Sequence, residues 1–236
     1  MKNHKKYSLS VLLIAIAAIV WYANSVKKIS HAPAVSESAV RESAVAPEEI
    51  GGVGLEGKGG DPQLNREKNR YTMPLDVADL TVASIIQIPS GLLAETGREK
   101  RERWSGAARD YARQQESRGV RIVGYLVRAK EEGRESCNGY SDSLHDYHIW
   151  VSDVPTNDKA NGLVVEITPR WESVRANWRI DQLERLAQHH ERVRVTGWLM
   201  WDEEHPDEVG KSRASQWEVH PVTNFEIFEG GAWKPL

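Results

Sequence analysis

The sequence predicts a mainly β fold with one or two helices, built around an OB-fold-like barrel of five strands. Five segments after residue 119 combine β-branched residues with apolar alternation, and turn residues separate them. One amphipathic helix pattern falls between the third and fourth of these segments, which is the element order of the OB-fold. The chain has a single cysteine, so packing must stabilise the fold without an intramolecular disulfide. The alternative architectures are another small β-barrel and an α+β sandwich.

The first predicted element is a transmembrane helix. Residues 7–26 carry no charged side chain and follow an amino end that is rich in lysine. About twenty helical residues cross a hydrocarbon core of about 30 Å. Trp21 and Tyr22 fall where a membrane interface is expected, and Lys27 and Lys28 close the segment.

A retained anchor and a cleaved signal peptide both fit such a segment. Ala23 is the best small residue for cleavage, but Trp21 stands two positions before it, where signal peptidase requires a small side chain. The sequence therefore favours a single-pass anchor in the cytoplasmic membrane. The lysine-rich amino end is expected to stay inside, which places the rest of the chain in the periplasm or outside the cell.

Three regions are expected after residues 1–28, which comprise the cytoplasmic tip and the anchor. Residues 29–70 are rich in small and polar side chains, which predicts a disordered linker. Residues 71–118 are expected to be a lead-in that ends in a helix over about residues 98–117. Residues 119–236 form the predicted barrel domain.

The elements of the barrel can be assigned in order along the chain. Strands are expected at residues 120–129, 145–152, 163–168, 192–201 and 216–228. The helix is expected at residues 178–190, with Asn177 as its N-cap and Ile180, Leu183 and Ala187 on its apolar face. Closing five strands into a barrel also removes exposed sheet edges.

Side-chain alternation gives each predicted strand an apolar and a polar face. The odd-numbered residues from 147 to 151 are apolar, so His148 points to the opposite face. The same rule places Glu166, Glu218 and His220 on that face of the third and last strands. OB-fold ligands bind this face, framed by the loop between strands one and two and the loop between strands four and five. We therefore expect the polar residues to converge there.

The converging residues define a candidate site. If a metal binds, Cys137, His148 and His220 are the expected ligands, and this mixture of soft and borderline donors favours zinc. Glu166 is the candidate catalytic residue, as a general base toward a metal-bound water. The candidate ligand-binding residues are Asn138, Asp146, Trp150, Asp202, His205 and Glu218.

Two functions from different classes remain open. The first is a membrane-anchored envelope domain that binds a small or polymeric ligand on this face without catalysis. The second is a zinc-dependent hydrolase that uses the cysteine, histidine and glutamate cluster. The structural alternative to both is a solvated sheet face on which Asp146 and Glu166 pair with arginine. A net charge of −3 and the lack of a basic patch argue against nucleic-acid binding.

Five sequence blocks carry a resemblance to a known group of domains. They are Glu135-Ser136-Cys137-Asn138, Asp146-Tyr147-His148-Ile149, residues 164–170 (VVEITPR), Gly197-Trp198-Leu199 with Asp202 and His205, and Trp217-Glu218-Val219-His220-Pro221. Over about residues 120–227 the chain resembles uncharacterised bacterial exported domains of OB-fold-like architecture. The resemblance implies that the blocks belong to one domain, and it implies no reaction.

Overall fold

The structure, a computed structural model, describes residues 45–236. In chain order the helices and strands are α2 (Pro62–Lys68), β1 (Val77–Leu80), α3 (Val82–Ile86), α4 (Gly106–Glu116), β2 (Gly119–Glu131), β3 (Tyr147–Ser152), β4 (Leu163–Ile167), α5 (Pro169–Glu172), α6 (Ile180–Gln188), β5 (Arg192–Trp201), β6 (Trp217–Glu229) and β7 (Ala232–Pro235). Short 3-10 turns cover Gly91–Glu95, Arg101–Arg103, Lys159–Asn161 and Pro206–Glu208.

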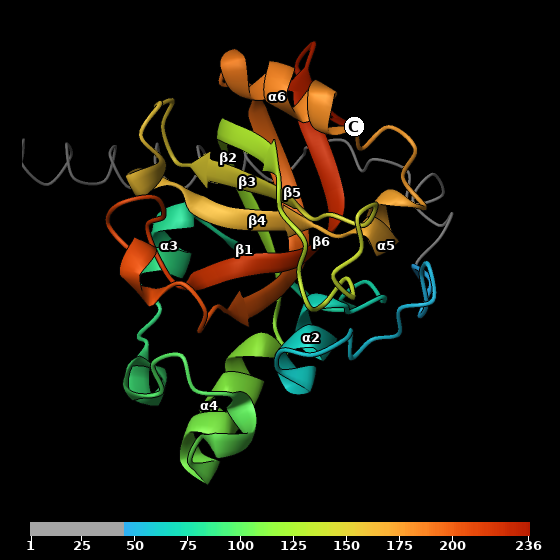
Figure 1. Cartoon of the computed structure of the whole chain (residues 1–236). Coiled ribbons are helices and arrows are strands. Elements are labelled where there is room, and N and C mark those ends of the chain that lie inside the picture. Colours follow the sequence, from blue (N-terminus) through green and yellow to red (C-terminus); the bar gives the residue numbers. More distant parts are fainter. Residues whose placement is uncertain (1–44) are drawn as a thin grey trace, which may run out of the picture. The chain divides into compact units, whose positions relative to one another are not determined.

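Five of the strands close into a barrel (Figure 1). β2 pairs antiparallel with β3 and with β5, β3 pairs antiparallel with β4, and β5 pairs antiparallel with β6. The ring is completed where β4 and β6 run parallel, through the single register pair of Val165 and Val219. The third and fifth barrel strands are therefore neighbours, and a helix joins the third strand to the fourth. The predicted OB-fold order is confirmed.

The barrel interior is apolar because alternate residues of each strand point inward. Ile149, Val165 and Val219 are fully buried in one large core. Burial of such a side chain stabilises the fold by roughly 1.5–3 kcal/mol. Trp150 and Val164, which stand next to core residues in the sequence, pair across β3 and β4 and belong to a separate buried cluster. The alternation therefore predicts the two faces of these strands correctly.

Helix α6 lies at one end of the barrel, and α2 and α4 lie at the other end (Figure 1). Its Leu183 and Ala187 are buried, as the amphipathic pattern predicts. The predicted helix start is wrong, because α6 begins at Ile180 and Arg179 takes the N-cap position without a side-chain hydrogen bond. The backbone N–H of Arg179 donates to the carbonyl of Asn177, so a turn occupies the residues where the helix was expected to begin.

Residues 45–70, which we call the covering segment, are ordered, although the sequence predicts a disordered linker there. Asp61 caps α2 by accepting hydrogen bonds from N–H groups of its first turn. The buried Arg170 donates four hydrogen bonds to backbone carbonyls between residues 47 and 54. The linker prediction fails here because the order comes from hydrogen bonds to a distant arginine and not from a run of apolar residues.

Other differences from the prediction lie at the edges of the domain. The helix expected over residues 98–117 is shorter, because α4 begins only after Ser105, whose hydroxyl accepts from the N–H of Ala108. Two further strands, β1 and β7, pair with β2 and β6. Within residues 45–236 no helix is long and apolar enough to cross a membrane. The predicted anchor at residues 7–26 lies outside the described residues.

Candidate functional site

A pocket of about 250 Å³ opens on the predicted ligand face of the barrel. Its wall comes from β3, β4 and β6, from the loops that follow β2 and β5, and from α2 of the covering segment. Four lysine or arginine side chains and six carboxylates line it. The pocket is therefore a polar cavity, not an apolar groove.

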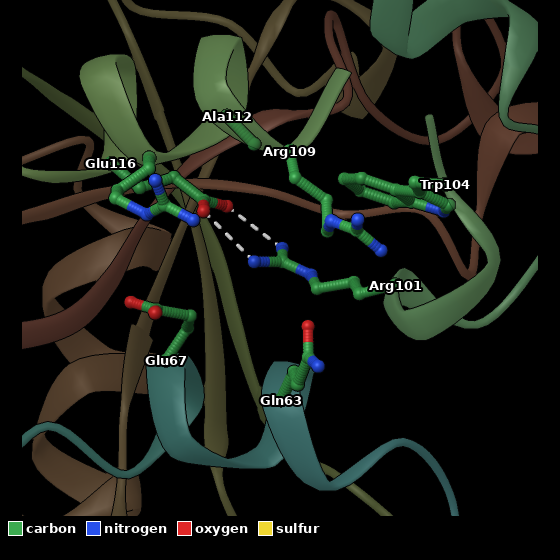
Figure 2. Close-up of a pocket in the computed structure, with 8 residues that line it drawn as sticks. Gln63, Glu67, Arg101, Trp104, Arg109, Ala112 and Glu116 are labelled. Carbon is green, nitrogen blue, oxygen red and sulfur yellow. Dashed lines mark hydrogen bonds and ion pairs between the residues drawn. The ribbon is translucent and has the colours of Figure 1, made fainter. Parts of the chain in front are cut away.

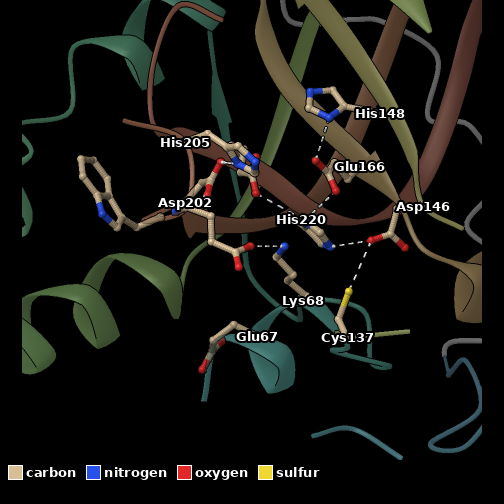
Figure 3. A network of polar contacts seen from close by, with 12 residues as sticks. Glu67, Lys68, Cys137, Asp146, His148, Glu166, Asp202, His205 and His220 are labelled. Atoms are coloured by element: carbon tan, nitrogen blue, oxygen red, sulfur yellow. Dashed lines mark hydrogen bonds and ion pairs between the residues drawn. The ribbon is translucent and has the colours of Figure 1, made fainter. Parts of the chain in front are cut away.

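Three buried side chains lie together at this pocket and aim polar atoms at one another (Figure 3). Asp146 directly precedes β3, Glu166 lies on β4 and His220 lies on β6. One donor atom from each lies within 4.8 Å of the other two. His220 Nε2 is 3.9 Å from Asp146 Oδ2. Neither this nitrogen nor Glu166 Oε2 has a hydrogen-bond partner within residues 45–236. We call these three residues the Asp-Glu-His triad.

Neighbouring side chains hold the other carboxylate oxygens of the triad. Asn138 donates to Asp146 Oδ1 at 3.0 Å. His148 Nδ1 lies 3.2 Å from Glu166 Oε1. In each carboxylate one oxygen is therefore fixed by a partner while the second faces the triad. This is the pattern in which outer residues orient the ligands of a metal site.

The imidazole of His220 is oriented in the same way. Its Nδ1 lies 3.4 Å from Glu218 Oε1 and 3.2 Å from Glu166 Oε2. A proton on Nδ1 can be donated to Glu218, which leaves the lone pair of Nε2 unused. A neutral histidine in this tautomer is the form that binds a metal ion.

Burial shifts the pKa values at the site toward neutral side chains. It raises the pKa of Asp146 and that of Glu218 to about 7, and it raises the pKa of Glu166 well above its ordinary range. It lowers the pKa of His220 well below its ordinary value. Without a cation the site therefore favours a neutral imidazole and a protonated Glu166, while Asp146 and Glu218 are each partly protonated at neutral pH.

A second group of donor atoms shares Asp146 with the triad. Cys137 Sγ is 3.3 Å from Glu135 Oε2 and 3.8 Å from Asp146 Oδ2. Lys68 of α2 forms an ion pair with Glu135 at 3.2 Å. Burial tends to raise the pKa of Glu135, but Lys68, His220 and the Cys137 thiol together lower it below its ordinary value, so the carboxylate stays ionised. Burial also raises the pKa of the Cys137 thiol.

Asp202 belongs to a compensated set of charges beside the triad. It accepts a hydrogen bond from Arg213, and His205 Nδ1 lies 2.8 Å from its Oδ2. Burial acts to raise the pKa of Asp202, but His205 and Arg213 lower it below its ordinary value. Arg213 also reaches Glu218 at 3.4 Å. The loop between β5 and β6 therefore contributes mostly paired charges, although Arg213 Nε and, on β3, His148 Nε2 also have no hydrogen-bond partner within residues 45–236.

Trp150 forms part of the pocket wall. Its ring stacks on His148 with centroids 4.2 Å apart, and its Nε1 donates to the carbonyl of Ser212 at 2.6 Å. The ammonium groups of Lys159 and Lys130 lie 4.9 Å and 5.9 Å from the centroid of the indole. These contacts place two cations close to one aromatic ring at the pocket.

The residues singled out from the sequence lie in or directly around this one pocket. Of the three expected metal ligands, only His220 belongs to the triad, Cys137 lies in the neighbouring donor group, and His148 belongs to neither. Asp146 and Glu166 are buried, and within the described residues neither forms an ion pair with an arginine. The face is therefore not the solvated surface of the structural alternative.

The sequence analysis misses several charged residues that line the pocket, among them Glu135, Lys68 and Arg213. Glu135 stands two positions before Cys137, so a signal was present. Lys68 lies in the segment predicted to be a linker, and Arg213 lies in a long polar loop without periodicity. Alternation along strands cannot assign either of these two positions to a site.

A second pocket, of about 90 Å³, lies between α2 and α4 (Figure 2). Arg101 donates to both oxygens of Glu116 at 2.8 Å and 2.7 Å and to Glu203 at 3.1 Å. Among the described residues, no buried side-chain atom of these three residues lacks a hydrogen-bond partner. Burial raises the pKa of Glu203 to about 7, although Arg101 acts in the opposite direction. The cluster stabilises the fold and offers no free ligand atom.

Comparison with known proteins gives a structural likeness and no sequence match. No protein-family model and no curated protein sequence matches the chain. A chain of the crystal structure of yeast Stn1 and Ten1 aligns with 66% of this protein at 12% sequence identity and a TM-score of 0.38. The match spans 65% of that chain, slightly less than two thirds of its length.

Proposed function

We propose that the domain binds one zinc ion at Asp146, Glu166 and His220 and acts as a zinc-dependent hydrolase. The observation that carries this proposal is the pair of buried unpaired atoms, Glu166 Oε2 and His220 Nε2, beside Asp146. A buried polar atom without a partner costs about 1–3 kcal/mol. A cation between these atoms would remove that cost.

The charges around the triad also favour a divalent cation. Four carboxylates gather there, those of Glu135, Asp146, Glu166 and Glu218. Within residues 45–236 their permanently charged partners are Lys68 and Arg213, and Arg213 is shared with Asp202. A buried excess of carboxylates is stable only when protons or a cation compensate it.

Zinc suits these ligands better than magnesium or calcium does. One imidazole nitrogen and two carboxylate oxygens give three protein ligands, which leaves the fourth position of a catalytic zinc site for water. The thiol of Cys137, 3.8 Å from Asp146 Oδ2, adds a soft donor beside the ion. In this assignment Cys137 and His148 support the site, and His220 is the one predicted ligand that binds the ion.

A bound zinc ion lowers the pKa of its water to about 7. Glu135 lines the pocket and is kept ionised by Lys68, so it can accept the proton of that water. A zinc ion held by Asp146, Glu166 and His220 would supply the hydroxide that replaces the leaving group, and Glu135 would return its proton to that leaving group. Glu166, the predicted general base, becomes a zinc ligand because its Oε2 is unpaired within the triad.

The cellular position is part of the same proposal. The predicted span at residues 7–26 would tether the domain to the cytoplasmic membrane, with its amino end inside. The pocket would then face the periplasm or the cell exterior and act on a ligand found there.

Elemental analysis of the full-length protein tests the metal. We expect one zinc per chain in the wild type and loss of zinc in His220→Ala and in Glu166→Gln, because each change removes one of three ligands. His205→Ala is the matched control, since it removes an imidazole from the same pocket outside the triad, and it should keep its zinc. A wild-type protein that takes up no zinc contradicts the proposal, as does equal loss in His205→Ala.

The same preparations test catalysis with p-nitrophenyl acetate as a reporter substrate. Glu135→Gln should keep one zinc per chain and lose about 10²–10⁴-fold in kcat/KM, the usual contribution of a general base. Zinc-loaded wild type without turnover above that of His220→Ala would exclude a hydrolase. Full activity in Glu135→Gln would show that the proton leaves by another route.

A further inference from the structure

We propose that residues 55–69 form a lid over the Asp-Glu-His triad and that Lys68 is the latch that keeps this lid closed. The lid goes beyond the proposed function, because the observations behind it hold with or without zinc. Only the identity of the ion that passes the lid rests on the zinc site. Three features support the lid: the burial of the triad, the way residues 55–69 are attached, and the position of Lys68.

The triad is closed off from solvent. Asp146 and His220 have no exposed surface, and Glu166 is buried. The pocket beside them is lined by Glu166 but by neither of the other two side chains. A ligand can therefore contact all three donor atoms only after part of the surrounding wall has moved. A site for a metal ion needs such an entry path.

The middle of the covering segment is a part of this wall that polar contacts hold in place. Both ends of the segment are anchored: Arg170 binds carbonyls between residues 47 and 54, and Arg70 donates to three carbonyls of α4, β5 and β6. Of residues 55–69, Leu64 is the one buried apolar side chain, and it belongs neither to the large core nor to the cluster around Trp150. A segment with so few apolar contacts opens at a lower free energy than the whole domain.

Glycines before α2 provide a hinge for this movement. Gly57, Gly59 and Gly60 all have a positive φ angle and directly precede Asp61, the N-cap of the helix. Glycine changes its backbone angles at little steric cost. Residues 57–60 can therefore absorb a rotation of α2 while the anchored ends stay in place.

Lys68 ties the lid to both loops that frame the pocket. Its buried side chain reaches from α2 toward the triad (Figure 3). Its Nζ lies 3.2 Å from Glu135 Oε2, in the loop after β2, and 2.8 Å from Glu204 Oε2, in the loop after β5. Both carboxylates are partly exposed, so water can solvate them once the ammonium leaves. Opening of the lid breaks both ion pairs, and closing restores them.

Cys137 reports whether the lid is open. It is the single cysteine of the chain, and its side chain is buried. Asn69, the last residue of the lid, donates to the backbone carbonyl of Cys137 at 2.9 Å. A thiol reagent therefore reads this one position, and it reacts only in molecules whose lid has moved away.

Labelling of the full-length protein with 5,5′-dithiobis(2-nitrobenzoic acid) tests the lid. A chelator is present, so that no bound metal protects the thiol. Lys68→Met should raise the labelling rate about tenfold, because the closed form loses two ion pairs that the open form lacks. Glu204→Gln removes one partly exposed pair and should raise the rate about threefold. Arg66→Met is the matched control: it removes an ion pair with Glu56 that lies within the lid, so the rate should not change.

Low concentrations of urea separate opening of the lid from unfolding of the domain. The lid exposes little surface when it opens, so the logarithm of the labelling rate should rise with urea less steeply than global unfolding predicts. A urea dependence equal to that of global unfolding, or equal rates in Lys68→Met and Arg66→Met, would overturn the lid. The expected labelling in a chain that takes up no zinc would keep the lid and refute the zinc site. Zinc binding with labelling only through global unfolding would do the reverse.

Discussion

Two clusters of buried charge in this domain differ in how completely they are paired. The guanidinium of Arg101 donates hydrogen bonds to the carboxylates of Glu116 and Glu203. It donates a further hydrogen bond to the carbonyl of Trp201 at 2.9 Å. In the Asp-Glu-His triad, by contrast, an imidazole nitrogen and a carboxylate oxygen have no hydrogen-bond partner within residues 45–236. Both clusters are almost completely buried.

The difference shows how a structural cluster can be told from a functional one. Complete pairing offsets the cost of burying charge, and the cluster then needs nothing from outside. Incomplete pairing leaves a cost that a bound ion, ligand or water can remove. Burial and charge alone do not separate the two cases.

Removal of the central cation should harm the paired cluster most. Arg101→Met leaves two buried carboxylates without their partner, so we expect the free energy of unfolding to fall by about 3–5 kcal/mol. Urea denaturation measures the change. Arg98→Met is the control, because Arg98 forms an exposed ion pair with Asp207 and should cost less than about 1 kcal/mol. Equal effects in the two variants would show that the Arg101 cluster does not stabilise the fold.

The triad should respond to zinc and not to the loss of one carboxylate. Zinc at a hundred times its Kd should raise the free energy of unfolding by about 2.7 kcal/mol, and a chelator should reverse the gain. Asp146→Asn should lose this gain, while its metal-free stability stays within about 1 kcal/mol of wild type. A loss in metal-free Asp146→Asn as large as that in Arg101→Met would contradict the distinction between the clusters.

The smallest expected effect is a change in the pKa of His205, which lines the pocket and pairs with Asp202. The hydrogen bond to Asp202 raises the pKa of His205, so the charged pair stabilises the fold below the ordinary histidine pKa and loses this effect as the pH rises through the raised value. In Asp202→Asn the pKa of His205 should fall toward about 6.5. An NMR titration of the imidazole measures it. An unchanged pKa would show that Asp202 is not the cause.

Strand periodicity predicts most of the fold and much of the site. The alternation around His148 and Glu166 predicts which face of β3 and β4 they share, and the structure pairs them directly. The covering segment was not foreseen, because its order depends on Arg170, which lies far along the chain. For that reason Lys68 was missed, and so was the burial of the whole polar face.

The parallel seam between β4 and β6 is held in register by one residue pair, Val165 and Val219. Glu166 and His220 stand at the next position along each of these strands. An ion bound by both residues would link β4 and β6 at the place where the two strands share a single register pair. Metal binding would then also complete the barrel. The metal-free domain would open transiently between β4 and β6, and the metal-bound domain would stay closed there.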